Sequence, residues 1–236
     1  MTEADWLGCT DPEAMLKSLR GSVSARKVRL FACHCCRRVW HLLSDPRSRA
    51  AVGVMELLAD GAAGEAERRP AHAAAWAAVT EAHQAGPGRF ALGNAARAAA
   101  DGCSHDAHAA ARAVAKFTAL AAAGTERRPR RQDRAHGAYP AECQAQAGLL
   151  RDLVGNPFRP VAVDPVCVAP AVTALAQAAY AERLLPGGAL DPARLAVLAD
   201  ALEDAGCTDP DILGHFCGPG PHARGCWVVD LLLDQE

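Results

Sequence analysis

The sequence has few aromatic residues and no long apolar run. Aromatic residues make up 5% of the 236 positions, although half of all residues are apolar. A membrane-spanning helix needs about eighteen uninterrupted apolar residues, which the chain lacks. The acidic segment 1–6 also lacks the charged and then apolar pattern of a secretion signal. These absences predict a soluble, cytoplasmic protein with no membrane partner.

Several common catalytic and nucleotide-binding motifs are also missing. The chain contains no G-x-x-x-x-G-K-[ST] loop, no G-x-G-x-x-G turn after a strand, no H-E-x-x-H helix and no G-x-S-x-G elbow. The net charge of −2 gives no general attraction for nucleic acid, which is therefore not expected as a partner. The missing motifs argue against an enzyme without deciding the question.

The residues that are present favour helices. Much of the apolar content is alanine, the strongest helix former, and β-branched residues occur only in short clusters. In the segment 24–43, apolar residues recur every three or four positions. At another helix start, Thr10 is expected to cap the helix while Glu13 completes a capping box. The predicted fold is all-α, either a multi-helix bundle or an orthogonal helical array. The segment 226–233 fits a helix or a buried strand, and we favour a helix because no partner strand is evident.

Composition divides the chain into three regions. Residues 1–61 form N-terminal helices, 62–138 form an alanine- and arginine-rich helical insert, and 139–236 form a C-terminal helical region. The insert ends in a basic, proline-broken stretch, 125–136. Such a stretch can touch nucleic acid or an acidic partner, but it has no interleaved aromatics and is better explained as a solvated loop.

The two ends of the chain are expected to pack on one another. Small side chains in the insert each bury little area, so we expect the apolar face of the helix 24–43 to pack against the segment 224–233 instead. This packing would place the N-terminal helices on the C-terminal region.

Ten cysteines and nine histidines supply the main candidates for chemistry. In a cytoplasmic protein the thiols stay reduced, and a buried free cysteine acts as a small apolar residue. No cofactor is required by the sequence, but zinc is the alternative, because soft ligands could converge. Their spacing differs from paired C-x-x-C knuckles. The candidate zinc ligands are Cys33, Cys36, Cys207, His215, Cys217, His222 and Cys226.

Cys226 is also the best local candidate for a catalytic nucleophile. His222 and Arg224 lie near it in sequence and could lower the pKa of its thiol. Because Cys226 directly precedes Trp227, a place in the core explains it more simply.

The helix 24–43 also carries a polar face. His34, Arg37, Arg38 and His41 lie opposite its apolar stripe and are candidates for binding phosphate or an acidic partner. A solvated helix face is the commoner explanation of such a pattern.

Three segments resemble signatures of an uncharacterised bacterial family of planctomycete type. They are 30–43, L-F-A-C-H-C-C-R-R-V-W-H-L-L, then 155–160, G-N-P-F-R-P, and 220–230, G-P-H-A-R-G-C-W-V-V-D. The segment 198–206 is similar to the A-D-W-L-E-E-x-G-D pattern of short repeat-companion domains, with Ala201 in place of tryptophan. The resemblance misses the insert. It implies family membership and a cytoplasmic setting, and it brings no activity with it.

The pentapeptide G-C-T-D-P occurs twice, at 8–12 and at 206–210. A glycine that stops one helix, followed by a capped start of the next, accounts for every position except the cysteine. The repeat therefore predicts a reused helix-to-helix turn.

Together these observations favour a cytoplasmic helical interaction or scaffold module without catalytic activity, whose partner is another protein. A zinc-stabilised helical domain is the second hypothesis. A cysteine-dependent enzyme is the third.

Overall fold

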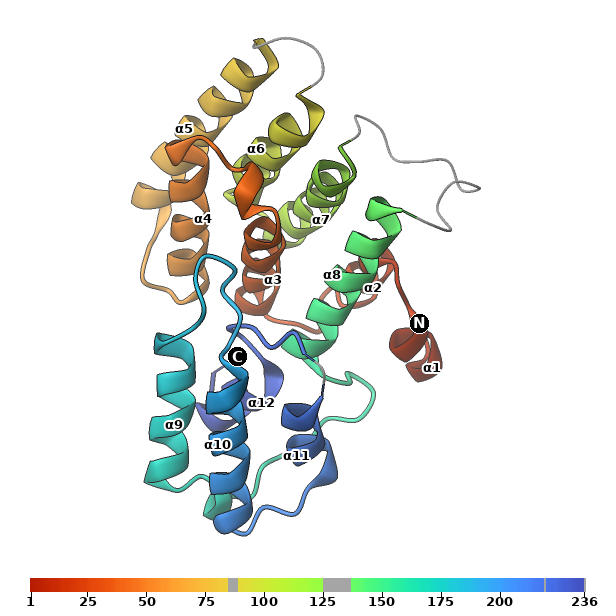
Figure 1. The fold of residues 1–236 in the computed structure, drawn as a ribbon, viewed down its shortest axis with the longest axis vertical. Coiled ribbons are helices and arrows are strands. Elements are labelled where there is room, and N and C mark those ends of the chain that lie inside the picture. The colour runs from red at the N-terminus through yellow and green to blue at the C-terminus, as the bar shows by residue number, and fades with distance from the viewer. Residues whose placement is uncertain (85–88, 125–136, 219, 236) are drawn as a thin grey trace. The chain divides into compact units, whose positions relative to one another are not determined.

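The computed structural model describes residues 1–84, 89–124, 137–218 and 220–235. Within these ranges regular structure is helical, and the only β-type pairings are isolated bridges of Ala189 with Leu184 and with Ala223. The all-α prediction is confirmed (Figure 1). Among the described residues, no helix combines the length and apolarity that spanning a membrane requires. The basic stretch 125–136 lies outside the described ranges, so its role as a solvated loop stays a prediction.

The chain forms two compact units. Unit 1 contains Gly8–Ala147 together with Met1, and unit 2 contains Thr2–Leu7 and Gly148–Glu236. The helix α8 contributes residues to both.

Unit 1 is built from helices of the N-terminal region and of the insert. Its elements are α2 (Pro12–Ser18), α3 (Ala25–Arg38), the short 3₁₀ turn η1 (Trp40–Leu42), α4 (Pro46–Ala59), α5 (Glu65–Gln84), α6 (Phe90–Gly102), α7 (Ala107–Ala123) and the first part of α8 (Ala138–Val154). The helix α3 packs against α4, α6 and α7, and α5 packs against α4 and α6 (Figure 1).

The insert therefore covers the helix α3, contrary to expectation. Small residues allow this packing because they let helix backbones approach closely. A Cβ atom added at Gly102 of α6 would lie 2.1 Å from the sulfur of Met55 in α4. Since α3 belongs to unit 1 and the segment 224–233 to unit 2, the packing of one on the other stays a prediction.

Unit 2 surrounds an apolar core of its own. Its elements are α1 (Glu3–Gly8), the end of α8, the 3₁₀ turn η3 (Pro165–Cys167), α9 (Pro170–Ala181), α10 (Pro192–Asp204), α11 (Pro210–Cys217) and α12 (Trp227–Leu232). The last residue of α1, Gly8, is assigned to unit 1. The helix α10 packs against α9 and α11, and α9 packs against α12. Leu198, Leu202, Val228 and Val229 are among the core residues. The helical prediction for 226–233 is confirmed by α12.

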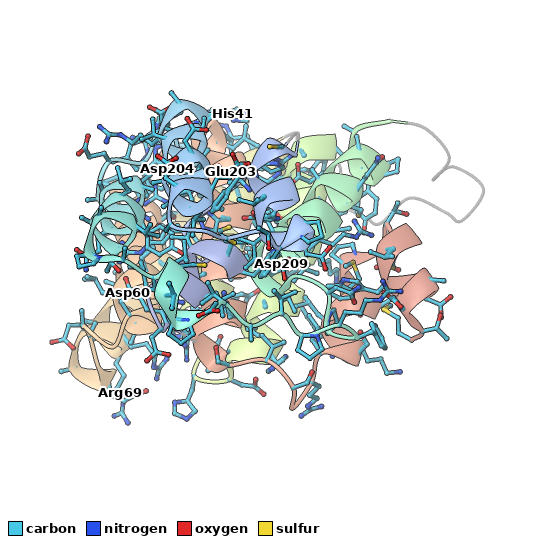
Figure 2. The ribbon with its side chains drawn as sticks, turned by 90° about the horizontal axis from the view of Figure 1, so that it is seen from below. His41, Asp60, Arg69, Glu203, Asp204 and Asp209 are labelled. Atoms are coloured by element: carbon cyan, nitrogen blue, oxygen red, sulfur yellow. The ribbon has the colours of Figure 1, made fainter. Side chains whose placement is uncertain are left out.

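Aspartate followed by proline begins most of the well-capped elements. The aspartate side chain accepts a backbone N–H of the first turn, and proline fits the first helical position, where its missing N–H costs nothing. The prediction that Thr10 caps the first of these helices is wrong. The helix α2 begins at Pro12, so Asp11 occupies the capping position and accepts the N–H of Glu13 at 3.0 Å. Asp209, labelled in Figure 2, caps α11 in the same way, so both G-C-T-D-P copies are Asp-capped helix starts.

Candidate metal centre

Four side chains from separate parts of unit 2 converge on one buried point. Asp152 lies near the end of α8, His215 in α11, His222 in the following loop, and Cys226 directly before α12. One potential ligand atom of each lies within 4.8 Å of those of the others. The exposed fractions of the side chains of Asp152, His215 and His222 are 5%, 15% and 9%, and Cys226 is fully buried. This group could hold a metal ion.

Local structure explains how the loop carries two of the four. The helix α11 ends at Cys217, and the loop then passes through Gly220 and Gly225, both with positive φ, which glycine adopts without strain. The backbone N–H of Leu190 donates to the carbonyl of His222 at 2.8 Å. This hydrogen bond fixes the loop where the histidine turns inward.

Asp152 is the acceptor at the centre of the group. Its Oδ1 lies 2.9 Å from His222 Nδ1 and 3.2 Å from His215 Nε2, while Oδ2 accepts the backbone N–H of Ala223 at 2.8 Å. Burial alone would raise the pKa of this carboxyl, but the hydrogen bonds from the two histidines outweigh it and hold the pKa below its usual value. Asp152 is therefore a buried anion.

His215 joins the carboxylate to the thiol. Its Nε2 lies 3.1 Å from the sulfur of Cys226 as well as 3.2 Å from Asp152. On the other side of the ring, the indole N–H of Trp227 donates to Nδ1 at 3.1 Å. Both ring nitrogens of His215 therefore have defined neighbours.

His222 has a nitrogen without such a neighbour. Its Nδ1 faces Asp152, whereas its Nε2 is buried and has no hydrogen-bond partner among the residues that the structure describes. A buried polar atom without a partner costs free energy. The group is thus not fully satisfied by the protein's own hydrogen bonds.

A second polar contact anchors the start of α12, next to Cys226. The hydroxyl of Tyr180 donates to Asp230 at 2.6 Å and accepts the backbone N–H of Gly225 at 3.1 Å. Burial, reinforced by the neighbouring Asp230, raises the pKa of Tyr180 well above its usual value, so this hydroxyl keeps its proton.

The structure brings together three of the seven candidate ligands predicted from the sequence: His215, His222 and Cys226. Cys207 lies buried in the core of unit 2 and Cys217 is exposed, and neither belongs to the group. Asp152 was missed, because nothing in its local sequence distinguishes it from other helical aspartates. Only the tertiary fold brings it next to residues more than sixty positions away.

Cys33 and Cys36 belong to unit 1 and are not in the group. With Cys35 they lie fully buried on α3. Burial raises the pKa of all three thiols, so they stay protonated and pack as small apolar side chains.

The polar face predicted on α3 is partly buried. His34 is 2% exposed and Arg37 9% exposed, so a solvated position is wrong for both. Arg37 forms a bidentate ion pair with Glu56, with N···O distances of 2.7 and 2.9 Å. Arg38 forms a bidentate ion pair with Glu142, with both N···O distances at 2.9 Å. His41 is exposed (Figure 2). A role of these four residues in binding a partner stays a prediction.

No family model, curated protein or solved structure matches this chain in a comparison with known proteins.

Proposed function

We propose that unit 2 is a helical domain stabilised by one zinc ion, within a cytoplasmic protein that binds another protein rather than catalysing a reaction. The observation that carries the zinc proposal is the convergence of Asp152, His215, His222 and Cys226 on a buried point, with their ligand atoms within 4.8 Å of one another. These residues come from two distant stretches of chain, Asp152 from the end of α8 and the other three from 215–226, more than sixty positions later. A shared ion would tie the stretches together.

The donor set suits zinc. One thiolate, two imidazole nitrogens and one carboxylate oxygen are ligand types that zinc accepts together, at distances of about 2.0 to 2.3 Å in a tetrahedral arrangement. Harder cations such as magnesium prefer oxygen ligands alone. Four protein ligands leave no position for water or substrate, which is typical of a structural rather than a catalytic zinc site. We therefore assign the ion a role in folding.

A cysteine-dependent enzyme is the weaker alternative. The 3.1 Å contact between Cys226 and His215 resembles the pair that activates a nucleophilic thiol. However, Cys226 is fully buried, so a substrate could not reach its sulfur without a rearrangement. In a catalytic triad a carboxylate accepts a hydrogen bond from the second histidine nitrogen. At His215 that nitrogen faces the indole N–H of Trp227 instead.

Elemental analysis of protein purified without chelator tests the zinc proposal. We expect about one zinc per chain in the wild type, the occupancy of a closed structural site. Cys226→Ser should lose the metal, because a serine hydroxyl stays protonated and is a poor zinc ligand. Cys217→Ser is the matched control: its thiol is exposed and outside the group, so this variant should keep the metal.

Thermal unfolding separates a zinc site from a packed thiol. For a zinc site, a chelator should lower the melting temperature of the wild type to that of Cys226→Ser, because metal binding contributes to folding. Absence of zinc from the wild type, with only a modest loss of stability in Cys226→Ser, would instead identify Cys226 as a buried thiol in a hydrogen-bonded cluster.

A further inference from the structure

We infer that Trp227 opposes metal binding, because its indole N–H stabilises the form of His215 that cannot bind a metal. This inference rests on the proposed zinc site and concerns its regulation. The four side chains of the group would then have two alternative states: in one they are held together by hydrogen bonds, and in the other by zinc. Exchange between them requires the contact between Trp227 and His215 to break.

The tautomer of His215 follows from the chemistry of its neighbour. The indole nitrogen of tryptophan is a donor only, so in its 3.1 Å contact with Trp227 the Nδ1 of His215 must accept. An accepting nitrogen carries no proton. In the neutral ring the proton therefore sits on Nε2, which faces Asp152 and Cys226.

Nε2 is also the nitrogen that a metal in this group would use. A metal needs the lone pair of Nε2, so the proton there must leave, and a neutral ring then carries it on Nδ1. Two N–H groups, one from His215 and one from Trp227, would then point at each other across 3.1 Å. His215 therefore cannot bind zinc through Nε2 and accept the indole hydrogen bond at Nδ1 at the same time.

The contrast with His222 supports this assignment. Metal-bound histidines usually donate their remaining N–H to an acceptor such as a carboxylate or carbonyl, which favours the binding tautomer. Neither nitrogen of His222 faces a donor such as the indole N–H: Nδ1 faces the carboxylate of Asp152, and the buried Nε2 has no hydrogen-bond partner among the described residues. His215 has a donor where such an acceptor would lie, so its surroundings favour the opposite tautomer.

Trp227 is held in this position by its packing. The backbone of Gly155 lies under the indole ring: a Cβ atom added there would be 3.1 Å from the ring carbon Cγ. Gly155 also has a φ of +70°, which disfavours any other residue. The rings of Trp227 and His215 meet edge to face, with centroids 5.3 Å apart. The opposing donor is therefore fixed by the fold.

The test measures zinc affinity of chelator-treated, metal-free protein by competition with a zinc indicator dye. Trp227→Phe keeps an aromatic ring against Gly155 but removes the N–H donor. Without the competing hydrogen bond, this variant should bind zinc about fivefold more tightly than the wild type, the factor that corresponds to one ordinary hydrogen bond. Trp40→Phe, in unit 1, is the matched control and should leave the affinity unchanged.

The sign of the effect separates this role from a merely structural one. If Trp227 only supported the fold around the site, Trp227→Phe would bind zinc more weakly or equally well, and either result would overturn the inference while leaving the zinc site in place. If neither the wild type nor Trp227→Phe took up zinc, the proposed function would fail and the inference with it. Zinc uptake by the variant alone would support the inference.

Nuclear magnetic resonance of ¹⁵N-labelled histidine in the wild type gives a second readout that does not depend on a variant folding. In metal-free protein the proton of neutral His215 should be on Nε2, and zinc should move it to Nδ1. A proton on Nδ1 before zinc is added would contradict the inference.

Discussion

Asp152 is the residue on which the buried group of unit 2 depends most. Its carboxylate faces His215 and His222 and accepts the backbone N–H of Ala223, with a 5% exposed side chain. An anion that is both buried and hydrogen-bonded on both oxygens cannot be replaced without leaving its partners unsatisfied. The same carboxylate would supply one of the four zinc ligands.

Substitution of Asp152 is therefore expected to weaken both stability and zinc binding. Asp152→Asn removes the charge and turns one acceptor oxygen into a donor, so a buried N–H of the group loses its acceptor and we expect the free energy of unfolding of unit 2 to fall by about 3 kcal/mol. Urea denaturation and zinc content measure the two effects. Asp200→Asn, at an exposed aspartate of α10, is the control and should change neither. A fully stable, zinc-loaded Asp152→Asn would show that the carboxylate is dispensable.

The buried pair of Arg37 and Glu56 makes a comparable prediction for unit 1. Glu56→Gln leaves a 9% exposed guanidinium without its carboxylate, so we expect a loss of about 3 kcal/mol in urea denaturation. Glu81→Gln is the matched control, since Glu81 pairs with Arg47 but its side chain is 62% exposed. It should cost less than about 1 kcal/mol, the usual value of a surface pair. Equal losses in both variants would show that burial does not decide the strength of the Arg37 pair.

At the level of helices, buried thiols on α3 and directly after α6 should make the stability of unit 1 depend on pH. Burial raises the pKa of Cys33, Cys35 and Cys36, and it raises the pKa of Cys103 to about 11 from an ordinary 9.0. Above about pH 9 the unfolded chain therefore releases thiol protons that the folded chain still holds, so stability falls as the pH rises. For Cys103 this loss levels off once the pH has passed the folded pKa of about 11.

Urea denaturation between about pH 8 and about pH 10 measures this dependence. Cys103→Ala should reduce the slope, because one buried thiol no longer contributes, whereas Cys217→Ser, at an exposed thiol, should leave it nearly unchanged. Stability that stays constant or rises over this range would contradict the burial of the thiols.

Local signals in the sequence predicted most of the elements. Aspartate–proline pairs mark helix starts because capping and the fixed φ of proline act within a few residues. The helix over 24–43 and the choice of helix for 226–233 rested on periodicity and on the lack of a partner strand, and both are confirmed apart from the ends, where α3 stops at Arg38. The capping residue was misplaced by one position at Thr10. A local pattern does not decide which of two adjacent residues caps a helix when both side chains can accept a hydrogen bond from the first turn.

At the scale of the whole chain, local patterns were less informative. His215, His222 and Cys226 were candidates because they lie close together in sequence, but Asp152 joins them only through the fold of unit 2. The segment Thr2–Leu7 likewise belongs to unit 2, where the indole N–H of Trp6 donates to the carbonyl of Gly155 at 3.1 Å. Contacts between residues about 150 positions apart leave no periodic trace in a single sequence.

X-ray diffraction from crystals of protein purified without chelator and grown with zinc, recorded on both sides of the zinc absorption edge, would show whether the four side chains bind the metal. We expect one anomalous peak per chain that appears only above the edge and is enclosed by Asp152, His215, His222 and Cys226, about 2.0 to 2.3 Å from their ligand atoms. Unit 2 with these four side chains in direct hydrogen-bond contact and no anomalous peak among them, in crystals grown with zinc, would contradict the zinc proposal.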